Sequence, residues 1–290
     1  MSVRTSTRDD VSFEVHSHAR ADAKQPGFRY KAARANKPGI VERILGITPP
    51  VVLGLFLFIG WYIGTTRGLI NSLILPTPTD FFSSLVNGIT SGLLLNSAVV
   101  TIEESVLGFL IALAVALPLG YALAKSRLIA AAVQPYLAAG QAIPAIIVAA
   151  LLVYWVGAGL LPITIVCMLV VLFPMVITTV LGMQTLDKAV VDAARVDGAS
   201  GWSLLASVEF PLALPAILAG IRTGLTLSIT GAVVGEFVGG GDQGLGSLVQ
   251  IAREQFNTPL VFATLFILAI LAALYYSFTW LLVKLAEAIY

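Results

Sequence analysis

Long apolar runs dominate this sequence and decide what it can fold into. A helix needs about 20 apolar residues in a row to cross the hydrocarbon core of a bilayer. Runs of about this length occur at roughly 46–66, 96–122, 133–157, 160–184, 213–237 and 258–283. Charged residues make up only 11% of the chain, against about 25% in soluble domains. The sequence therefore predicts an all-α polytopic membrane protein with about six transmembrane helices.

The placement of the basic residues predicts how these spans are oriented. Cytoplasmic loops of membrane proteins carry an excess of Lys and Arg. Of the 17 Lys and Arg residues, Arg67 and Arg253 alone fall in the segments assigned to the outer side, and Arg222 lies within a span. The others lie in the N-terminal tail, around Lys125, in the segment 187–211 and near the C-terminus. We therefore expect both termini and the segment 187–211 in the cytoplasm.

The first 45 residues differ in composition from the rest of the chain. Residues 1–45 are polar and basic, which predicts a cytoplasmic tail that is disordered over its first half. Residues 1–39 contain no apolar segment behind the first charges and so do not resemble a secretory signal. The tail holds the only histidines, His16 and His18, which we expect to be solvated rather than metal-bound. Residues 46–290 are assigned to one transmembrane domain.

Two stretches between the predicted spans carry turn and short-helix signals. The first, residues 67–95, contains Pro76 and Pro78, which favour turns, among short helical pieces. Three of its apolar side chains are expected to rest on the membrane interface: Phe81, Phe82 and Leu85. The second, residues 238–257, predicts a glycine-rich turn followed by a short amphipathic helix.

Motifs for catalysis or nucleotide hydrolysis are absent from the sequence. No Lys follows a Gly, which excludes a Walker A motif, and neither HExxH nor GxSxG occurs. The lone cysteine, Cys167, lies in an apolar run and is interpreted as a small buried hydrophobe. The sequence therefore predicts no catalytic residue, no bound cofactor and no metal site. Any uphill transport must draw its energy from a partner or from an ion gradient.

The fifth predicted span, 213–237, carries a stripe of small residues and several hydroxyl groups. The small residues recur every three or four positions, at Gly220, Gly224, Ser228, Gly231 and Gly235. Such stripes let membrane helices approach closely, so this one indicates either static packing or a sliding interface around a pathway. The hydroxyl-bearing residues are the candidates for the translocation path: Thr223, Thr226, Ser228 and Thr230.

Charged residues and prolines inside spans are the other features with a functional interpretation. A charge within the bilayer is costly, so we expect Arg222 either to snorkel to the interface or to form an ion pair with an acid, and an ion pair is favoured over contact with a substrate. Glu236 is interpreted as interfacial, and Glu103 and Glu104 lie in the outer third of the second span. Prolines at or within spans favour bent or cavity-lining helices, although proline is common in membrane helices generally: Pro118, Pro144, Pro162, Pro174 and Pro215.

A polar segment separates the fourth and fifth predicted spans. Asp187 is placed to cap a helix that runs through residues 192–194 and ends at Gly198, since glycine supplies the left-handed conformation that commonly ends a helix. A second helix, WSLLASVEF, follows and is closed by Pro211. The segment therefore predicts two short cytoplasmic helices with a bend at Gly198. The alternative is a helical hairpin resting on lipid through its apolar residues: Leu204, Leu205 and Val208.

This segment resembles the EAA loop of ABC-importer permeases, the binding-protein-dependent transport inner-membrane family. The family pattern is EAA, three residues, Gly, nine residues and then I-x-L-P. Here the matching positions are Asp192, Ala193, Ala194, Gly198, Val208, Phe210 and Pro211, with Asp for Glu, Val for Ile and Phe for Leu. The spacing is intact. The resemblance extends over roughly 70–285, and the flanking segments are most similar to the nitrate/sulfonate/taurine branch, which also includes permeases for thiamine precursors.

The resemblance implies a fold like that of type I ABC-importer permeases and a role in transport rather than catalysis. It implies a permease homodimer in the bacterial plasma membrane, a cytosolic ABC ATPase dimer that holds ATP and Mg²⁺, and an extracytoplasmic substrate-binding protein. Nucleic acid is not among the implied partners. The residues implied to couple the permease to the ATPase lie in the loop 187–211: Asp192, Ala193, Ala194, Gly198 and Pro211.

Two other functions remain open at the level of sequence. One is a secondary transporter or channel in which 192–211 is an interfacial hairpin, and uptake from an ion gradient without an ATPase would identify it. The other, a membrane-embedded enzyme, has almost no support, because no nucleophile–base pair or metal-ligand set is present. The cargo is also open: oxyanions, sulfonates and neutral heterocycles are all compatible with the sequence.

Overall fold

The computed structural model describes residues 40–239 and 244–289. The chain divides into two units after Leu53, within helix α1 (Ile40–Thr66), and each unit is described by itself. The described part of the first unit, residues 40–53, is helical. The predicted tail 1–45 therefore lies outside the described residues except for its last six positions.

The second unit is built from helices, and its described residues include no strand. Four helical segments are long and apolar enough to cross a membrane. They contain α3 (Leu93–Lys125), α6 (Leu160–Gln184), α9 (Phe210–Gly239) and α11 (Thr258–Ile289). These helices confirm four of the predicted spans. A shorter apolar helix, Val52–Thr66, forms part of α1, so the all-α polytopic class is confirmed.

The span predicted at 133–157 is broken into two helices. Helix α4 (Arg127–Ala142) and helix α5 (Ala145–Val156) meet at a bend of 92°. The break falls at Ile143 and Pro144, which are both extended, with ψ of 123° and 127°. Proline disfavours helical geometry in the residue before it and has no N–H to continue the ladder. The pair counts as a fifth span if both halves belong to one crossing.

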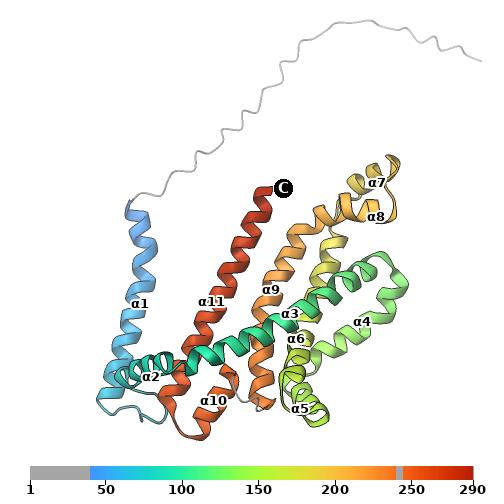
Figure 1. The fold of residues 1–290 in the computed structure, drawn as a ribbon. Coiled ribbons are helices and arrows are strands. Elements are labelled where there is room, and N and C mark those ends of the chain that lie inside the picture. The colour runs from blue at the N-terminus through green and yellow to red at the C-terminus, as the bar shows by residue number, and fades with distance from the viewer. Residues whose placement is uncertain (1–39, 240–243, 290) are drawn as a thin grey trace, which may run out of the picture. The chain divides into compact units, whose positions relative to one another are not determined.

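Helix α6 lies at the centre of the bundle, between α3 and α9, and makes its most extensive contacts with these two helices (Figure 1). Small and branched side chains fill this core. Ala112 and Ala116 of α3 are fully buried against Val171 and Val176 of α6. Leu225 brings α9 into the same cluster. Small residues therefore let α3 and α9 pack closely against the branched side chains of α6.

The stripe of small residues on α9 packs against α6. A Cβ added at Gly231 would lie 2.7 Å from the Cα of Cys167, which is closer than real contacts allow. A Cβ at Gly235 would lie 3.1 Å from the Cα of Ile163. Ser228 belongs to the same stripe and is fully buried. Between the two interpretations of the stripe, the structure favours close helix packing within the chain.

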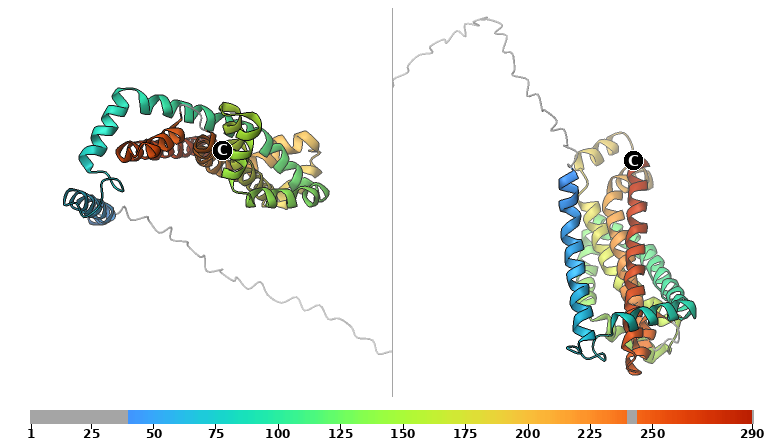
Figure 2. Two further views of the ribbon diagram at one scale, coloured as in Figure 1. Left: turned by 90° about the horizontal axis from the view of Figure 1, so that it is seen from below. Right: turned by 90° about the vertical axis from the view of Figure 1, so that its left-hand side faces the viewer.

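Short helices gather at the two ends of this bundle. Helices α7 (Lys188–Val196) and α8 (Gly201–Leu204) lie at one end, which we call the α7 end (Figures 1 and 2). Helices α2 (Pro78–Thr90) and α10 (Leu245–Glu254) lie at the other, which we call the α10 end. Helix α10 confirms the short helix predicted within 238–257. The glycine-rich turn expected before it falls largely at 240–243, outside the described residues.

The predicted interfacial position is wrong for two of the three apolar residues of α2. Phe81 and Leu85 are buried in a cluster that includes Ala263 of α11. Only Phe82 is exposed, at 52%. Helix α2 starts at Thr77, whose hydroxyl accepts a hydrogen bond from the N–H of Asp80 at 3.2 Å. This cap directs one face of α2 onto the bundle, which buries two of its three apolar residues.

Candidate functional site

Helix α7 begins and ends where the sequence predicts. The side chain of Asp187 accepts a hydrogen bond from the N–H of Ala189 at 2.9 Å and so caps the first turn. At the other end, Gly198 has a φ of +93°, and its N–H donates to the carbonyl of Arg195 at 3.0 Å. The N–H of Ala199 donates to the carbonyl of Ala194 at 2.9 Å. These two bonds form a Schellman motif, which gives the bend a defined geometry.

The surface of α7 carries the residues of the EAA-like motif. Asp192 and Ala193 are exposed, and Ala194 is half-buried. The Oδ1 atom of Asp192 accepts a hydrogen bond from Nη1 of Arg195 at 2.9 Å. Large apolar side chains flank the bend and are exposed, Val196 at 87% and Trp202 at 78%. Large exposed apolar groups beside charged ones are typical of a protein-binding surface.

Pro211 does not close a second helix, contrary to the prediction. Helix α8 continues through one π-helical turn, η1 (Leu205–Glu209), into α9, so that Gly201–Gly239 forms one helical segment. The N–H of Phe210 donates to the carbonyl of Leu205, five residues back. A proline ring clashes with the carbonyl four residues before it, and the wider π turn accommodates this clash.

An ion pair joins this helical segment to α3. Nζ of Lys125, in the last turn of α3, contacts Oε1 of Glu209 in η1. The Glu209 side chain is 1% exposed and that of Lys125 is 36% exposed. The pair lies beside a cavity of about 510 Å³ that Asp192 and Arg195 also line. This pair could not be predicted from the sequence, because 84 residues separate its members.

The four candidates for the translocation path do not share a face of α9. Thr223 and Thr230 are exposed, and Thr226 is half-buried. Ser228 is fully buried, and its hydroxyl donates to the carbonyl of Leu225 at 2.8 Å. The close contact of α9 with α6 covers Ser228 in this structure, and its assignment to the path stays a prediction. The three threonines stay a prediction.

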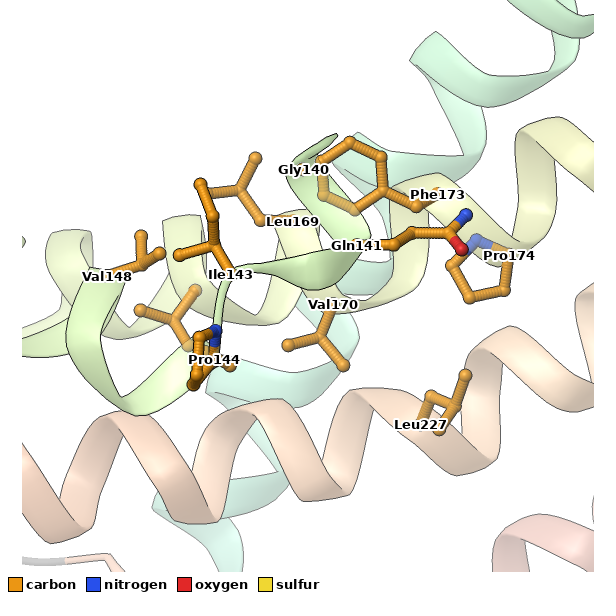
Figure 3. Close-up of a pocket in the computed structure, with 12 residues that line it drawn as sticks. Gly140, Gln141, Ile143, Pro144, Val148, Leu169, Val170, Phe173, Pro174 and Leu227 are labelled. Carbon is orange, nitrogen blue, oxygen red and sulfur yellow. The ribbon is translucent and has the colours of Figure 1, made fainter. Parts of the chain in front are cut away.

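A cavity of about 500 Å³ lies at the α4–α5 break. Its walls come from the end of α4, the start of α5, the middle of α6 and one residue of α9, Leu227. Figure 3 shows the amide of Gln141 pointing toward the part of the cavity that Phe173 and Pro174 line. Among the described residues that line this cavity, none carries a charge. Pro144 and Pro174 are a signal for this cavity in the sequence, but their positions alone did not predict it.

Glu236 is not interfacial, contrary to the prediction, because it is buried at the α10 end. It is 1% exposed, and its Oε1 accepts a hydrogen bond from the hydroxyl of Thr101 at 2.6 Å. Its Oε2 accepts a hydrogen bond from the N–H of Gly246 in α10. Glu104 is buried, and its Oε2 atom has no hydrogen-bond partner among the described residues, whereas Glu103 is exposed. The adjacent acids of α3 thus have opposite environments.

Arg222 does not form the predicted ion pair with any residue that the structure describes. Its guanidinium instead lies over the ring of Tyr276 in α11, with 4.1 Å between the Cζ atom and the ring centroid. A cation over an aromatic face is stabilised by the ring quadrupole. This contact holds α9 against α11 and satisfies the charge without an acid.

The described helices define a multi-pass membrane protein. Residues 116–288 match the model of the binding-protein-dependent transport system inner membrane component family. The chain belongs to this family and is a permease subunit of an ABC importer. Family membership implies an ATPase and a substrate-binding protein as partners in general.

Several relatives of this chain are named as transport permease proteins. The riboflavin transport system permease protein RibX of Chloroflexus aurantiacus is 42% identical over 236 residues, which cover 81% of this chain and 87% of that protein. A probable ABC transporter permease protein of Haemophilus influenzae is 35% identical, over 81% of this chain and 95% of its own length. The putative aliphatic sulfonates transport permease protein SsuC of Bacillus subtilis is 29% identical, over 91% of this chain and 94% of that protein.

Proposed function

We propose that this permease imports a small solute and is driven through its 187–211 segment by a cytosolic ABC ATPase dimer. The ATPase binds the α7 surface at Asp192, Ala193 and Ala194. Gly198 sets the angle of the bend, and Pro211 lies where the π turn passes into α9. ATP and Mg²⁺ are bound and turned over by the ATPase, while this chain supplies the path through the membrane.

The observation that carries this proposal is the mechanical continuity between α7 and the membrane span. The Schellman motif gives α7 a defined end, and α8 then runs through η1 into α9 without a break in the helix. The Lys125–Glu209 ion pair ties the same segment to α3. A displacement of α7 by a partner is therefore transmitted to α9 and α3 together. A loosely tethered loop would absorb such a displacement.

The remaining partners follow from the same proposal. Two copies of the chain form the pathway as a homodimer, and an extracytoplasmic binding protein delivers the solute. The protein lies in the bacterial plasma membrane with both termini in the cytoplasm. The distribution of Lys and Arg supports this orientation, and the C-terminal end of α11 lies toward the α7 end (Figures 1 and 2). The threonines on the exposed side of α9, Thr223, Thr226 and Thr230, contribute to the path.

The experiment that tests this proposal is Gly198→Val in the complete transporter. A valine at a φ of +93° is strained, so the bend changes while the spans stay intact. We expect the variant to assemble with its ATPase but to lose at least tenfold in ATP-dependent uptake into proteoliposomes. The matched control is Gly60→Val, because Gly60 is helical with open space around it. Normal uptake by Gly198→Val, or an equal loss in the control, contradicts the proposal.

A further inference from the structure

We propose that the cavity at the α4–α5 break binds a neutral heteroaromatic solute that carries hydrogen-bond donors and acceptors along one edge. This inference rests on the proposed transport function and specifies its cargo. The site is formed by Gln141, the backbone around Ile143 and Pro144, and the side chains of Val170 and Phe173. The volume of about 500 Å³ lies in the range of small-molecule sites.

The helical backbone is broken between α4 and α5. Irregular backbone at membrane depth is tolerated only where it is buried in protein or lines a water-filled cavity. Ile143 and Pro144 are both exposed on this chain. If α4 and α5 form one crossing, the break therefore faces a pathway or another subunit rather than lipid. Broken helices of this kind line solute sites in many transporters.

Hydrogen-bonding groups lie at the break between these two helices. The last carbonyls of α4 and the first N–H groups of α5 have no partners in their own helices, and α5 starts without a side-chain cap. The carbonyl of Pro144 accepts from Ile147 N at 3.0 Å, and Pro144 and Ala145 line the cavity beside Gln141. The Gln141 amide both donates and accepts hydrogen bonds. Among the described side chains of the cavity wall, it is the one that can form hydrogen bonds to a solute.

The cavity wall offers no charged side chain among the described residues. Apart from the Gln141 amide, side chains on the cavity wall are apolar, and the described residues that line it include neither Lys nor Arg. An anion removed from water without a cationic partner pays a large desolvation penalty. A planar apolar ring stacks well against Phe173 and the branched side chains. The lining therefore offers no cationic side chain to an oxyanion or a sulfonate, and its apolar walls suit an uncharged ring system.

The test measures binding to the full-length permease in lipid nanodiscs, without ATPase or binding protein. Riboflavin and radiolabelled uracil serve as neutral probes, and methanesulfonate and nitrate serve as competing anions. We expect saturable binding of at least one neutral probe that neither anion displaces. Gln141→Leu removes the amide at similar size, and Val170→Trp fills the cavity. Gln141→Leu is expected to weaken binding about fivefold, the effect of one lost hydrogen bond. Val170→Trp is expected to weaken it by about tenfold or more, because the indole ring occupies the space that the solute needs.

The matched control is Ile177→Trp, which adds the same bulk to α6 outside the cavity and is expected to bind the probe normally. The proposal is overturned if neither neutral probe binds, as it would be if lipid or a second copy filled the cavity. Displacement by the anions, or normal binding in both cavity variants, also overturns it. Because no ATPase is present, these outcomes are independent of the coupling experiment with Gly198→Val, whose failure would leave the binding result standing.

Discussion

The hydroxyl of Thr101 on α3 donates a hydrogen bond to the carboxylate of Glu236 on α9, 2.6 Å away, across 135 residues of sequence. The same hydroxyl oxygen accepts from the N–H of Leu245 at 2.9 Å. Gly246 donates its N–H to the other carboxylate oxygen. A Cβ at Gly246 would lie 2.8 Å from that oxygen, which explains the glycine at this position. One buried carboxylate therefore joins α3, α9 and α10.

Glu236→Ala is expected to loosen the α10 end of the bundle. The substitution leaves the Gly246 N–H without its acceptor, and a buried unpaired group costs about 1–3 kcal/mol. The Thr101 hydroxyl loses Glu236 but keeps the carbonyl of Ser97 as an acceptor at 3.1 Å. The free energy of unfolding in mixed detergent micelles should fall accordingly, and the amides of α10 should exchange faster with deuterium. Glu103→Ala is the control, because it removes an exposed carboxylate from the same helix as Thr101. Equal effects of the two substitutions would count against the buried network.

Lys125→Met is expected to destabilise the protein more than the double variant Lys125→Met/Glu209→Leu. Removing one partner of a buried pair leaves an uncompensated charge and costs about 3–5 kcal/mol, whereas apolar replacement of both partners is often neutral. Glu209 would be left as a buried, uncompensated charge, because its side chain is 1% exposed. The double-mutant cycle is measured by unfolding in mixed micelles.

The control for this cycle is the exposed pair of Asp192 and Arg195, whose atoms lie 2.9 Å apart. Exposed pairs contribute about 0–1 kcal/mol, so Arg195→Met should change the free energy of unfolding little. A Lys125→Met variant as stable as the wild type would show that Glu209 is compensated by another group.

The spans and the limits of α7 were predictable because their signals are local. Run length alone identifies α6 at 160–184, and Asp187 and Gly198 mark the start and the end of α7 through short-range hydrogen bonds. The break at Pro144 was harder to predict. Proline is tolerated inside α3, α4, α6 and α9, so the residue type alone does not show which proline ends a helix.

The buried charges were not predictable, because their partners lie far away in sequence. Glu236 looks interfacial from its position near the end of a span, and only Thr101 and α10 bury it. Ser228 shows a different limit. Ser228 belongs both to the stripe of small residues and to the hydroxyl-bearing residues proposed for the path. A side chain can face only one side of its helix, and Ser228 packs against Cys167 of α6.

Gly231→Ala is expected to separate α9 from α6. The added Cβ would lie 2.7 Å from the Cα of Cys167, and backbone on both sides leaves no flexible group to yield. Overpacking of this kind costs about 1–3 kcal/mol, measurable as a lower thermal unfolding temperature in detergent. Gly60→Ala is the control, since nothing lies near its Cβ and alanine favours helix. A Gly231→Ala protein as stable as this control would refute close packing at the stripe.

Asp192→Lys is expected to weaken association with the ATPase under the proposed function. Asp192 is exposed on the α7 surface, so the substitution reverses a charge without disturbing the core. Co-purification of the ATPase with the tagged permease should fall several-fold, and more so at low salt, where charge repulsion is less screened. Glu254→Lys makes the same change in an exposed residue at the α10 end and should leave the complex intact. Equal recovery with both variants would argue against docking through Asp192.

Tyr276→Leu is expected to weaken the contact between α11 and α9, because Arg222 loses the aromatic face that now lies 4.1 Å from its Cζ atom. A cation–π contact contributes about 0.5–2 kcal/mol, the larger value applying where water is excluded. The free energy of unfolding in mixed micelles should fall by this amount. Tyr276→Phe keeps the ring and removes only the hydroxyl, so it should match the wild type. If Tyr276→Phe destabilises the protein as much as Tyr276→Leu, the hydroxyl rather than the ring holds α11 in place.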